Sequence, residues 1–382
     1  MVELTAQQRD IRGAAREFAE GEFPDIAAEH DEKGTFPYDV WKKGCEAGFI
    51  GSFIQEKYEG AGLGMLECAL ILEEFWRVDP GCGNVFLATL GAEFIQDFGN
   101  EEQKKSYLSP LTKAKSIVGT VAGEDYIHNS FRYRKRGEKD YVLNGSSKFV
   151  INGTIADHLV IVAEKEQAQS EEKSRFSTFV IDRNREGVNT VELSDKLGVR
   201  ASDICKVILV DVSVFPEELI GREGEGMGHF EAFLDRLCVY NSAQAIGASQ
   251  GCLERSAKYS KQRVQFGHPI GWFQMTQFKI AEMATRIEAA RSICYQAARQ
   301  FDRGRIDRKA LSMASWFSRE TSSMAAAETL QIHGGYGYMN EMDIQRFYRD
   351  VQFLEFFGAS REREKLRVAE ELLGKTTTCG NV

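Results

Sequence analysis

Hydrophobic positions in the first part of the chain recur with the period of a helix. Ile11, Ala15 and Phe18 are spaced four and three residues apart, which places them on one helical face. A broader apolar face extends over residues 66–76, and prolines stand at the expected breaks between such segments. This pattern predicts an N-terminal domain made of helices over residues 1–115.

From about residue 116 the period changes to two. Short runs rich in Val and Ile, such as SIVGTVAG, HLVIVAEK and CKVILVDVSVF, are separated by polar or glycine-containing turns. Alternation of this kind is typical of strands, and turns between short runs favour hairpins. We therefore predict a small antiparallel β domain over residues 116–225.

Helical spacing returns from residue 226 and continues to the end of the chain. The stretch FKIAEMATRIEAARSICYQAARQF carries apolar residues every three or four positions, which predicts a long helix with one buried stripe. Long helices joined by short links favour an antiparallel bundle. The predicted fold is of the α+β class: a helical domain, a β domain and a C-terminal four-helix bundle over residues 226–382.

Composition narrows the classes of partner and compartment. The net charge of −9 and the lack of a long basic run argue against nucleic acid or an anionic membrane as a partner. No apolar run reaches the roughly 20 residues that span a bilayer, and the N-terminus lacks the pattern of a signal peptide. Eight scattered cysteines and isolated histidines indicate neither a zinc site nor a disulfide framework. These features predict a cytoplasmic protein without a metal site.

Three short motifs carry the chemical information in the sequence. RVQFGHPIGWFQMTQ starts at Arg263, QIHGGYGY starts at Gln331, and LGVRAS starts at Leu197. In this order, and with an RFYRD stretch that ends at Asp350, they resemble the acyl-CoA dehydrogenase family over essentially the whole chain. The resemblance implies an enzyme that oxidises an acyl thioester with flavin adenine dinucleotide (FAD).

The adenine and diphosphate half of FAD requires positive charge and close approach of the backbone. Arg263 can supply the charge, and Gly334 and Gly335 have no Cβ to keep the backbone at a distance. In the family, these two motifs hold this half of the flavin across a subunit interface. By resemblance, the residues that bind it here are Arg263, Gln265, Phe266, Gln274, Gln331, Gly334 and Gly335.

Other matches concern the flavin ring and the partners. The resemblance places Phe149, Ile151 and Ser360 on the ring side, where Phe149 and Ile151 replace an indole and a hydroxyl of the family pattern. It also implies a coenzyme A or acyl-carrier-protein thioester as substrate and an electron-transfer flavoprotein as electron acceptor. Because the flavin grip is completed across subunits, a homotetramer or dimer is expected.

The carboxylate base of the family reaction is missing from both of its usual positions. The reaction removes a proton next to the thioester carbonyl, which requires a base within hydrogen-bond reach. Counting from Asp350 places one position at Gly358, or at Phe357 if one residue is deleted, and the other position falls at Leu237. None of these side chains accepts a proton, and Cys238 stands where the family has an arginine.

A displaced base would therefore have to come from elsewhere in the chain. Tyr240 lies one helical turn after Leu237, whereas Asp235 falls on another face of the same predicted helix. Glu355 lies three positions before Gly358. Other candidates stand in an altered and shortened loop beside the flavin: Glu124, Asp125 and His128.

Four functions are compatible with this pattern. The first is oxidation of an acyl thioester with a non-standard base and an unusual acyl group, cyclic, branched or already unsaturated. The second is reduction of an enoyl thioester, where the loss of a strong base matters less. The third is a flavin-holding but silent subunit paired with an active homologue, and the fourth is a flavin monooxygenase.

Overall fold

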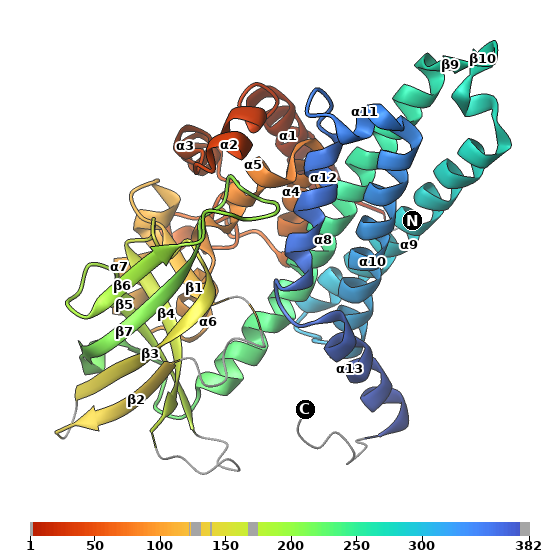
Figure 1. Ribbon diagram of the computed structural model, residues 1–382. Helices are drawn as coiled ribbons and strands as arrows, with labels where there is room; N and C mark the ends of the chain where they lie inside the picture. Colours follow the sequence, from red (N-terminus) through yellow and green to blue (C-terminus); the bar gives the residue numbers. More distant parts are fainter. Residues whose placement is uncertain (1–2, 122, 124–130, 138–139, 167–174, 375–382) are drawn as a thin grey trace.

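The computed structural model describes residues 3–121, 123, 131–137, 140–166 and 175–374. Figure 1 shows a β-sheet on one side of the molecule and a bundle of long helices on the other, with the N-terminal helices above their junction. This arrangement has the three successive parts that the change of hydrophobic period predicts.

The N-terminal part is helical, as predicted. Its elements are α1 (Ala6–Glu22), α2 (Ala27–Lys33), α3 (Tyr38–Glu46), η1 (Glu56–Tyr58), α4 (Met65–Val78), α5 (Pro80–Gly83), η2 (Asn84–Thr89), α6 (Ala92–Phe98) and α7 (Glu101–Thr112). Helix α1 begins at a capping box, in which Thr5 and Gln8 satisfy each other's backbone N–H groups. Helix α4 is buried over most of its length because it packs against α1, α8 and α9.

The middle part is one eight-stranded sheet. Its strands are β1 (Val118–Val121), β2 (Phe131–Arg136), β3 (Asp140–Ile151), β4 (His158–Lys165), β5 (Phe176–Asp182), β6 (Val188–Glu192), β7 (Ile204–Val214) and β8 (Leu219–Ile220). The order is β6-β7-β3-β1-β4-β5-β8, with β2 paired to β3 and β4. Most pairs are antiparallel, as predicted, but β4 runs parallel to both β1 and β2, so the sheet is mixed. Sequence periodicity cannot reveal this, because it fixes which residues are buried and not which strands become neighbours.

The C-terminal part is built on α8 (Gly226–Gln262), α9 (Gln274–Asp302) and α10 (Arg308–His333), which pack against one another. A fourth helix, α13 (Arg361–Leu373), packs on α10. The shorter elements are β9 (Val264–Gln265), β10 (His268–Pro269), η5 (Ile270–Trp272), α11 (Gly335–Tyr338), α12 (Ile344–Asp350) and η6 (Val351–Glu355). The hairpin β9–β10 projects from the end of the bundle that lies far from the sheet (Figure 1).

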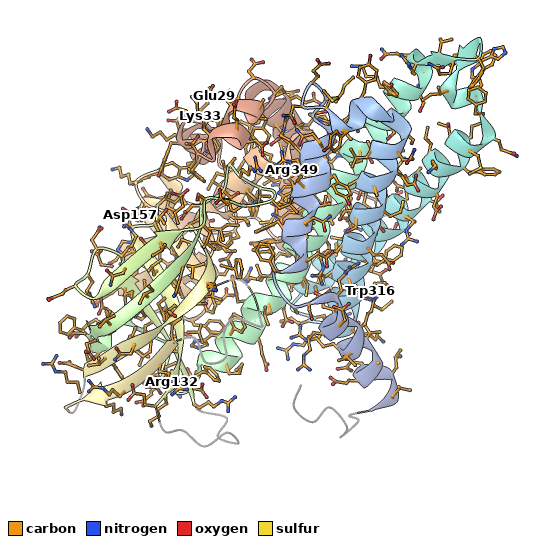
Figure 2. All side chains as sticks on the ribbon, in the orientation of Figure 1. Glu29, Lys33, Arg132, Asp157, Trp316 and Arg349 are labelled. Atoms are coloured by element: carbon orange, nitrogen blue, oxygen red, sulfur yellow. The ribbon has the colours of Figure 1, made fainter. Side chains whose placement is uncertain are left out.

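Two of the sequence motifs meet at a junction of all three parts. Arg349 donates to Asp31 of α2 (2.6 Å) and to the Leu197 carbonyl (2.9 Å), and Figure 2 labels it near the centre of the molecule. A Cβ on Gly198 would lie 2.3 Å from the Arg349 carbonyl oxygen, which only glycine avoids. The LGVR and RFYRD motifs are therefore joined by packing.

Within the described ranges, no helix is long and apolar enough to cross a membrane. The same part of the chain contains no group of three His, Cys, Asp or Glu side chains placed to hold a metal ion. The seven described cysteines are buried and unpaired.

Candidate active site

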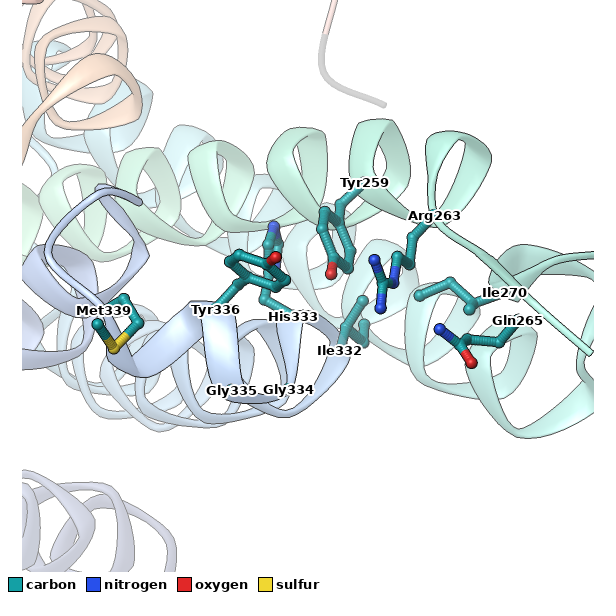
Figure 3. Close-up of a pocket in the computed structure, with 10 residues that line it drawn as sticks. All are labelled: Tyr259, Arg263, Gln265, Ile270, Ile332, His333, Gly334, Gly335, Tyr336 and Met339. Carbon is teal, nitrogen blue, oxygen red and sulfur yellow. The ribbon is translucent and has the colours of Figure 1, made fainter.

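A cleft of about 520 Å³ lies at the far end of the bundle (Figure 3). It is formed by the last turn of α8, the hairpin β9–β10 and the turn from α10 into α11. Four residues assigned to FAD by the sequence line it together: Arg263, Gln265, Gly334 and Gly335. This volume lies in the ordinary range of small-ligand sites.

The backbone of the cleft is open where the two glycines stand. Helix α10 ends at His333, and Gly334 follows with a φ of +56°, a conformation that side chains disfavour. A Cβ at Gly334 or at Gly335 would meet no atom within 4 Å. The main chain here is therefore accessible to a ligand from the cleft.

Arg263 gives the cleft its positive charge. Its guanidinium lies 5.8 Å from the centre of the Tyr336 ring, and no carboxylate of the described residues forms an ion pair with it. Nδ1 of His333 lies 2.8 Å from the Thr329 carbonyl oxygen, to which it donates, and the ring stacks on that of Tyr259. Burial lowers the pKa of His333, which favours the neutral ring. One unpaired guanidinium beside open backbone fits the diphosphate of FAD.

The remaining residues of the adenine-side prediction lie around this cleft without lining it. Gln331 is exposed near the end of α10, and Gln274 is exposed at the start of α9. Phe266 is 90% exposed at the hairpin tip, and Trp272 nearby is 67% exposed. The hairpin thus presents aromatic surface that the described residues leave exposed.

The ring-side residues form a second group at the junction between the sheet and the bundle. A bulge in the β3–β7 pairing gives Phe149 a φ of +59°, and its ring centre lies 5.4 Å from that of Phe356. Ile151 is buried next to it in β3, and Ser360 caps α13 by accepting from the Arg363 N–H. Figure 1 shows this junction well away from the hairpin, so one chain does not bring the two groups into one site.

The two positions that the sequence predicts for the base adjoin. Gly358 forms an isolated β-bridge with Gly123, outside the named strands, and has a φ of +89°. A Cβ on Gly358 would lie 3.8 Å from the Cβ of Leu237 and 3.0 Å from Nδ2 of Asn241. Phe357 is fully buried, stacks on Phe353, and accepts a hydrogen bond from Asn241 through its carbonyl. Both predicted positions therefore lie at one point in the fold, and neither Leu237 nor Gly358 has a carboxylate.

A buried guanidinium lies beside Cys238 even though the family arginine is absent from that position. The Cys238 thiol lies 3.7 Å from Oε1 of Glu364, and Glu364 pairs with Arg319 of α10. Arg319 also donates to the carbonyls of Leu354 (3.0 Å) and Ala359 (2.9 Å). Burial raises the pKa of Glu364 to about 7. The sequence predictions did not include Arg319. The signal that could have identified it is an arginine among small residues on a helix that is largely buried.

Among the candidate bases, Tyr240 has an acidic partner that the sequence did not suggest. Its hydroxyl donates to Oε1 of Glu93 at 3.3 Å, and both side chains are buried. Burial raises the pKa of Glu93 to about 7. Asp235 is instead paired with Arg308 (3.1 Å), and Glu355 is paired with Arg361 (2.8 Å). The other candidates, Glu124, Asp125 and His128, lie outside the described residues.

Comparison with known families gives matches along nearly the whole chain. The N-terminal, middle and C-terminal domains of acyl-CoA dehydrogenase match residues 5–115, 120–212 and 224–373 respectively.

Individual relatives include enzymes named for opposite directions of reaction. The chain is 33% identical over 379 residues to a 3-(aryl)acrylate reductase of Clostridium sporogenes, covering 97% of this chain and 99% of the relative. It is 32% identical to the caffeyl-CoA reductase–Etf complex subunit CarC of Acetobacterium woodii, covering 97% and 100%. The structure of butyryl-CoA dehydrogenase from Megasphaera elsdenii superimposes with a TM-score of 0.92 at 30% identity, covering 98% and 100%.

Proposed function

Because the chain belongs to the acyl-CoA dehydrogenase family, we propose that it oxidises an acyl thioester between C2 and C3. The protein is a flavin oxidoreductase that acts on CH–CH donors, and FAD is its cofactor. When bound, FAD supplies the acceptor for the hydride. The residues of this chain bind FAD, orient the thioester and handle the proton.

The observation that carries this proposal is the convergence of Leu237 and Gly358 next to the ring-side group. Residues from α8 and from the stretch before α13 meet at one point, beside Phe149 and Phe356. In this arrangement the substrate carbon that loses its proton lies near that point. Since neither position holds a carboxylate, the base is non-standard, and the acyl group is expected to be cyclic, branched or unsaturated.

A second candidate function is reduction of a 2-enoyl thioester. The specific observation in its favour is the same missing carboxylate, because the reductive direction needs a proton donor and not a strong base. Glu93, with its pKa raised to about 7, holds a proton for part of the time at neutral pH. Two relatives are named as reductases of aryl acrylates and of caffeyl-CoA, which agrees with this direction.

The proposal includes two protein partners. A second copy of the chain would complete the FAD site, because the adenine-side cleft and the ring-side group lie apart in one chain and the hairpin exposes Phe266 and Trp272. An electron-transfer flavoprotein would reoxidise the flavin, in keeping with the relative named as a subunit of an Etf complex. Coenzyme A or an acyl carrier protein would carry the acyl group.

The proposal is tested by an anaerobic absorbance titration of the FAD-loaded protein with linear, branched, cyclic and aryl acyl-CoA thioesters. Bleaching of the oxidised flavin band by one thioester identifies a dehydrogenase and the class of its substrate. In a parallel experiment, chemically reduced protein is mixed with enoyl thioesters such as cinnamoyl-CoA. Rapid reoxidation there, without bleaching in the first titration, identifies a reductase.

The remaining outcomes decide against both directions. A protein that binds FAD but reacts in neither experiment would be the silent subunit, and its activity would appear only with a homologous partner chain. Rapid reoxidation of the reduced flavin by air, without any response to thioesters, would identify a monooxygenase.

A further inference from the structure

Two pairs of polar side chains join helices α6 and α8, and the two pairs lie one helical turn apart. Asp97 and Arg236 form an ion pair at 2.8 Å, with both side chains partly exposed. Glu93 and Tyr240 form the second pair, with Oε1 and the hydroxyl 3.3 Å apart. The two acceptors stand four positions apart on α6, and the two donors stand four positions apart on α8.

The second pair is buried and lacks the cation that the first pair has. Glu93 is 2% exposed and has no cationic partner within ion-pair distance among the described residues. Its other oxygen accepts from the Gly91 N–H at 2.8 Å. Burying a carboxyl group without a cation is unfavourable, and an apolar contact would dock the helices as well. The neighbouring ion pair already performs that role.

Tyr240 of this pair belongs to the same stretch of α8 as Leu237, one of the two positions predicted for the base. Tyr240 stands one helical turn after Leu237, whose Cβ adjoins Gly358. The next residue, Asn241, donates to the Phe357 carbonyl, and its own amide oxygen is buried without a partner in the described part of the chain. This stretch of α8 therefore carries two buried polar side chains, Tyr240 and Asn241, within about one turn of Leu237.

We propose that Tyr240 and Glu93 form the proton relay of the reaction, in which the phenol exchanges a proton with C2 of the thioester and the carboxyl group exchanges one with the phenol. This inference rests on the proposed function. In oxidation, the C2–H bond breaks and its proton joins the Tyr240 oxygen, while the phenol proton passes to Oε1 of Glu93. The electron pair of the C2–H bond would form the C2–C3 double bond, and FAD, when bound, would supply the acceptor for the hydride lost from C3. In reduction, each transfer is reversed.

The electrostatic surroundings favour a neutral Tyr240 phenol and a Glu93 carboxyl group that can gain or lose the proton. Burial raises the pKa of the Tyr240 phenol well above its ordinary value, so the phenol stays neutral, and the proton is stored on Glu93. Glu93 is influenced by Arg236 of α8, which lowers its pKa, and by Asp97 of α6, which raises it. Cys68 of α4, the third helix at this pair, also raises the pKa of Tyr240.

The experiment separates proton transfer from hydride transfer by using thioesters with sulfur in place of C3. The probes are (phenylthio)acetyl-CoA and 3-thiahexanoyl-CoA, which have no C3–H bond and therefore cannot reduce the flavin. Each is incubated with the oxidised FAD-loaded protein in D₂O, and deuterium at C2 is measured by mass spectrometry. Binding is followed separately through the change in the flavin absorbance spectrum.

Three variants are compared with the wild type at equal FAD content. Tyr240→Phe and Glu93→Gln are nearly isosteric and remove one member of the relay each. Asp97→Asn is the matched control, because it weakens the other pair between the same two helices. We expect the first two to slow exchange by about 100-fold or more, the usual contribution of a general acid or base, and the control to retain the wild-type rate. The wild-type exchange rate should also change near pH 7, and Glu93→Gln should lose that inflection.

The other results contradict the inference in distinguishable ways. Exchange that persists in Tyr240→Phe and Glu93→Gln, or that falls equally in Asp97→Asn, would mean that the pair only docks α6 on α8. A wild type that binds both probes without exchanging C2 hydrogen would overturn the relay and leave the proposed function standing. If no thioester alters the flavin spectrum, the proposed function fails, and the relay fails with it.

Discussion

Leu237 lies against Gly358, with 3.8 Å between the Cβ of Leu237 and the place of a Cβ on Gly358. The two residues come from α8 and from the stretch before α13, which are distant in the sequence. They are not equivalent as places for a carboxylate. Leu237 belongs to a regular helix, whereas Gly358 has a φ of +89° and a Cβ there would meet Asn241 at 3.0 Å.

Leu237→Glu is therefore predicted to create a working base. A positioned general base contributes about 10²- to 10⁴-fold, so the thioester that bleaches the flavin best should do so at least about 100-fold faster. The rate is measured by anaerobic stopped-flow absorbance. Leu237→Gln is the control, because it has the same size and no proton-accepting oxygen anion. Equal bleaching rates in these two variants, with FAD retained in both, would contradict the prediction.

Arg263→Ala is predicted to weaken FAD binding. Arg263 is the unpaired guanidinium of the adenine-side cleft, and hydrogen bonds to charged groups contribute about 1.5–3 kcal/mol. The affinity of the apoprotein for FAD, measured by quenching of flavin fluorescence, should fall by about 10- to 100-fold. Lys261→Ala removes an exposed positive charge from the last turn of the same helix and should leave the affinity unchanged. A similar loss in both variants would assign the effect to net charge and not to the cleft.

The sequence predicted the order of helical, β and helical parts because hydrophobic period reports burial within each element. It also identified Arg263, Gln265, Gly334 and Gly335 through motifs, and these four residues do line one cleft. Local motifs group such residues because each contributes several neighbouring residues to the same wall, whereas their role in FAD binding stays a prediction.

What the sequence could not show depends on packing between distant elements. The contact of Glu93 with Tyr240 exists only because α6 lies on α8, and no pattern within either helix predicts it. Arg319 reaches Glu364 from α10 for the same reason. The parallel neighbours of β4 likewise follow from the path of the whole chain through the sheet.

Arg319→Met is predicted to destabilise the protein strongly. Arg319 and Glu364 are both fully buried, and removal of one partner of such a pair typically costs about 3–5 kcal/mol. The loss is measured as a fall in melting temperature at fixed protein and FAD concentration. Arg319→Met combined with Glu364→Leu should recover part of the loss, because no unpaired charge remains. It should not recover all of it, since the carbonyls of Leu354 and Ala359 still lack their donor. A double variant no more stable than Arg319→Met would contradict this account.

Glu93→Gln is predicted to change how stability depends on pH. Burial raises the pKa of Glu93 from 4.5 to about 7, so between these values the folded protein holds a proton that the unfolded chain has released. The free energy of unfolding then decreases as the pH rises through this window, by roughly 3 kcal/mol in total, and levels off above it.

Glutamine does not titrate, so the variant lacks this decrease. The melting temperature of Glu93→Gln relative to that of the wild type should rise between pH 5 and pH 7 and stay constant at higher pH. Asp350 and Glu364, whose pKa values burial also raises to about 7, titrate equally in both proteins and cancel in the difference. The measurement is a series of thermal unfolding curves at equal protein and FAD concentration. A difference that is the same at every pH would show that Glu93 stays ionised in the folded protein, and it would remove the proton that the relay needs to donate in the reductive direction.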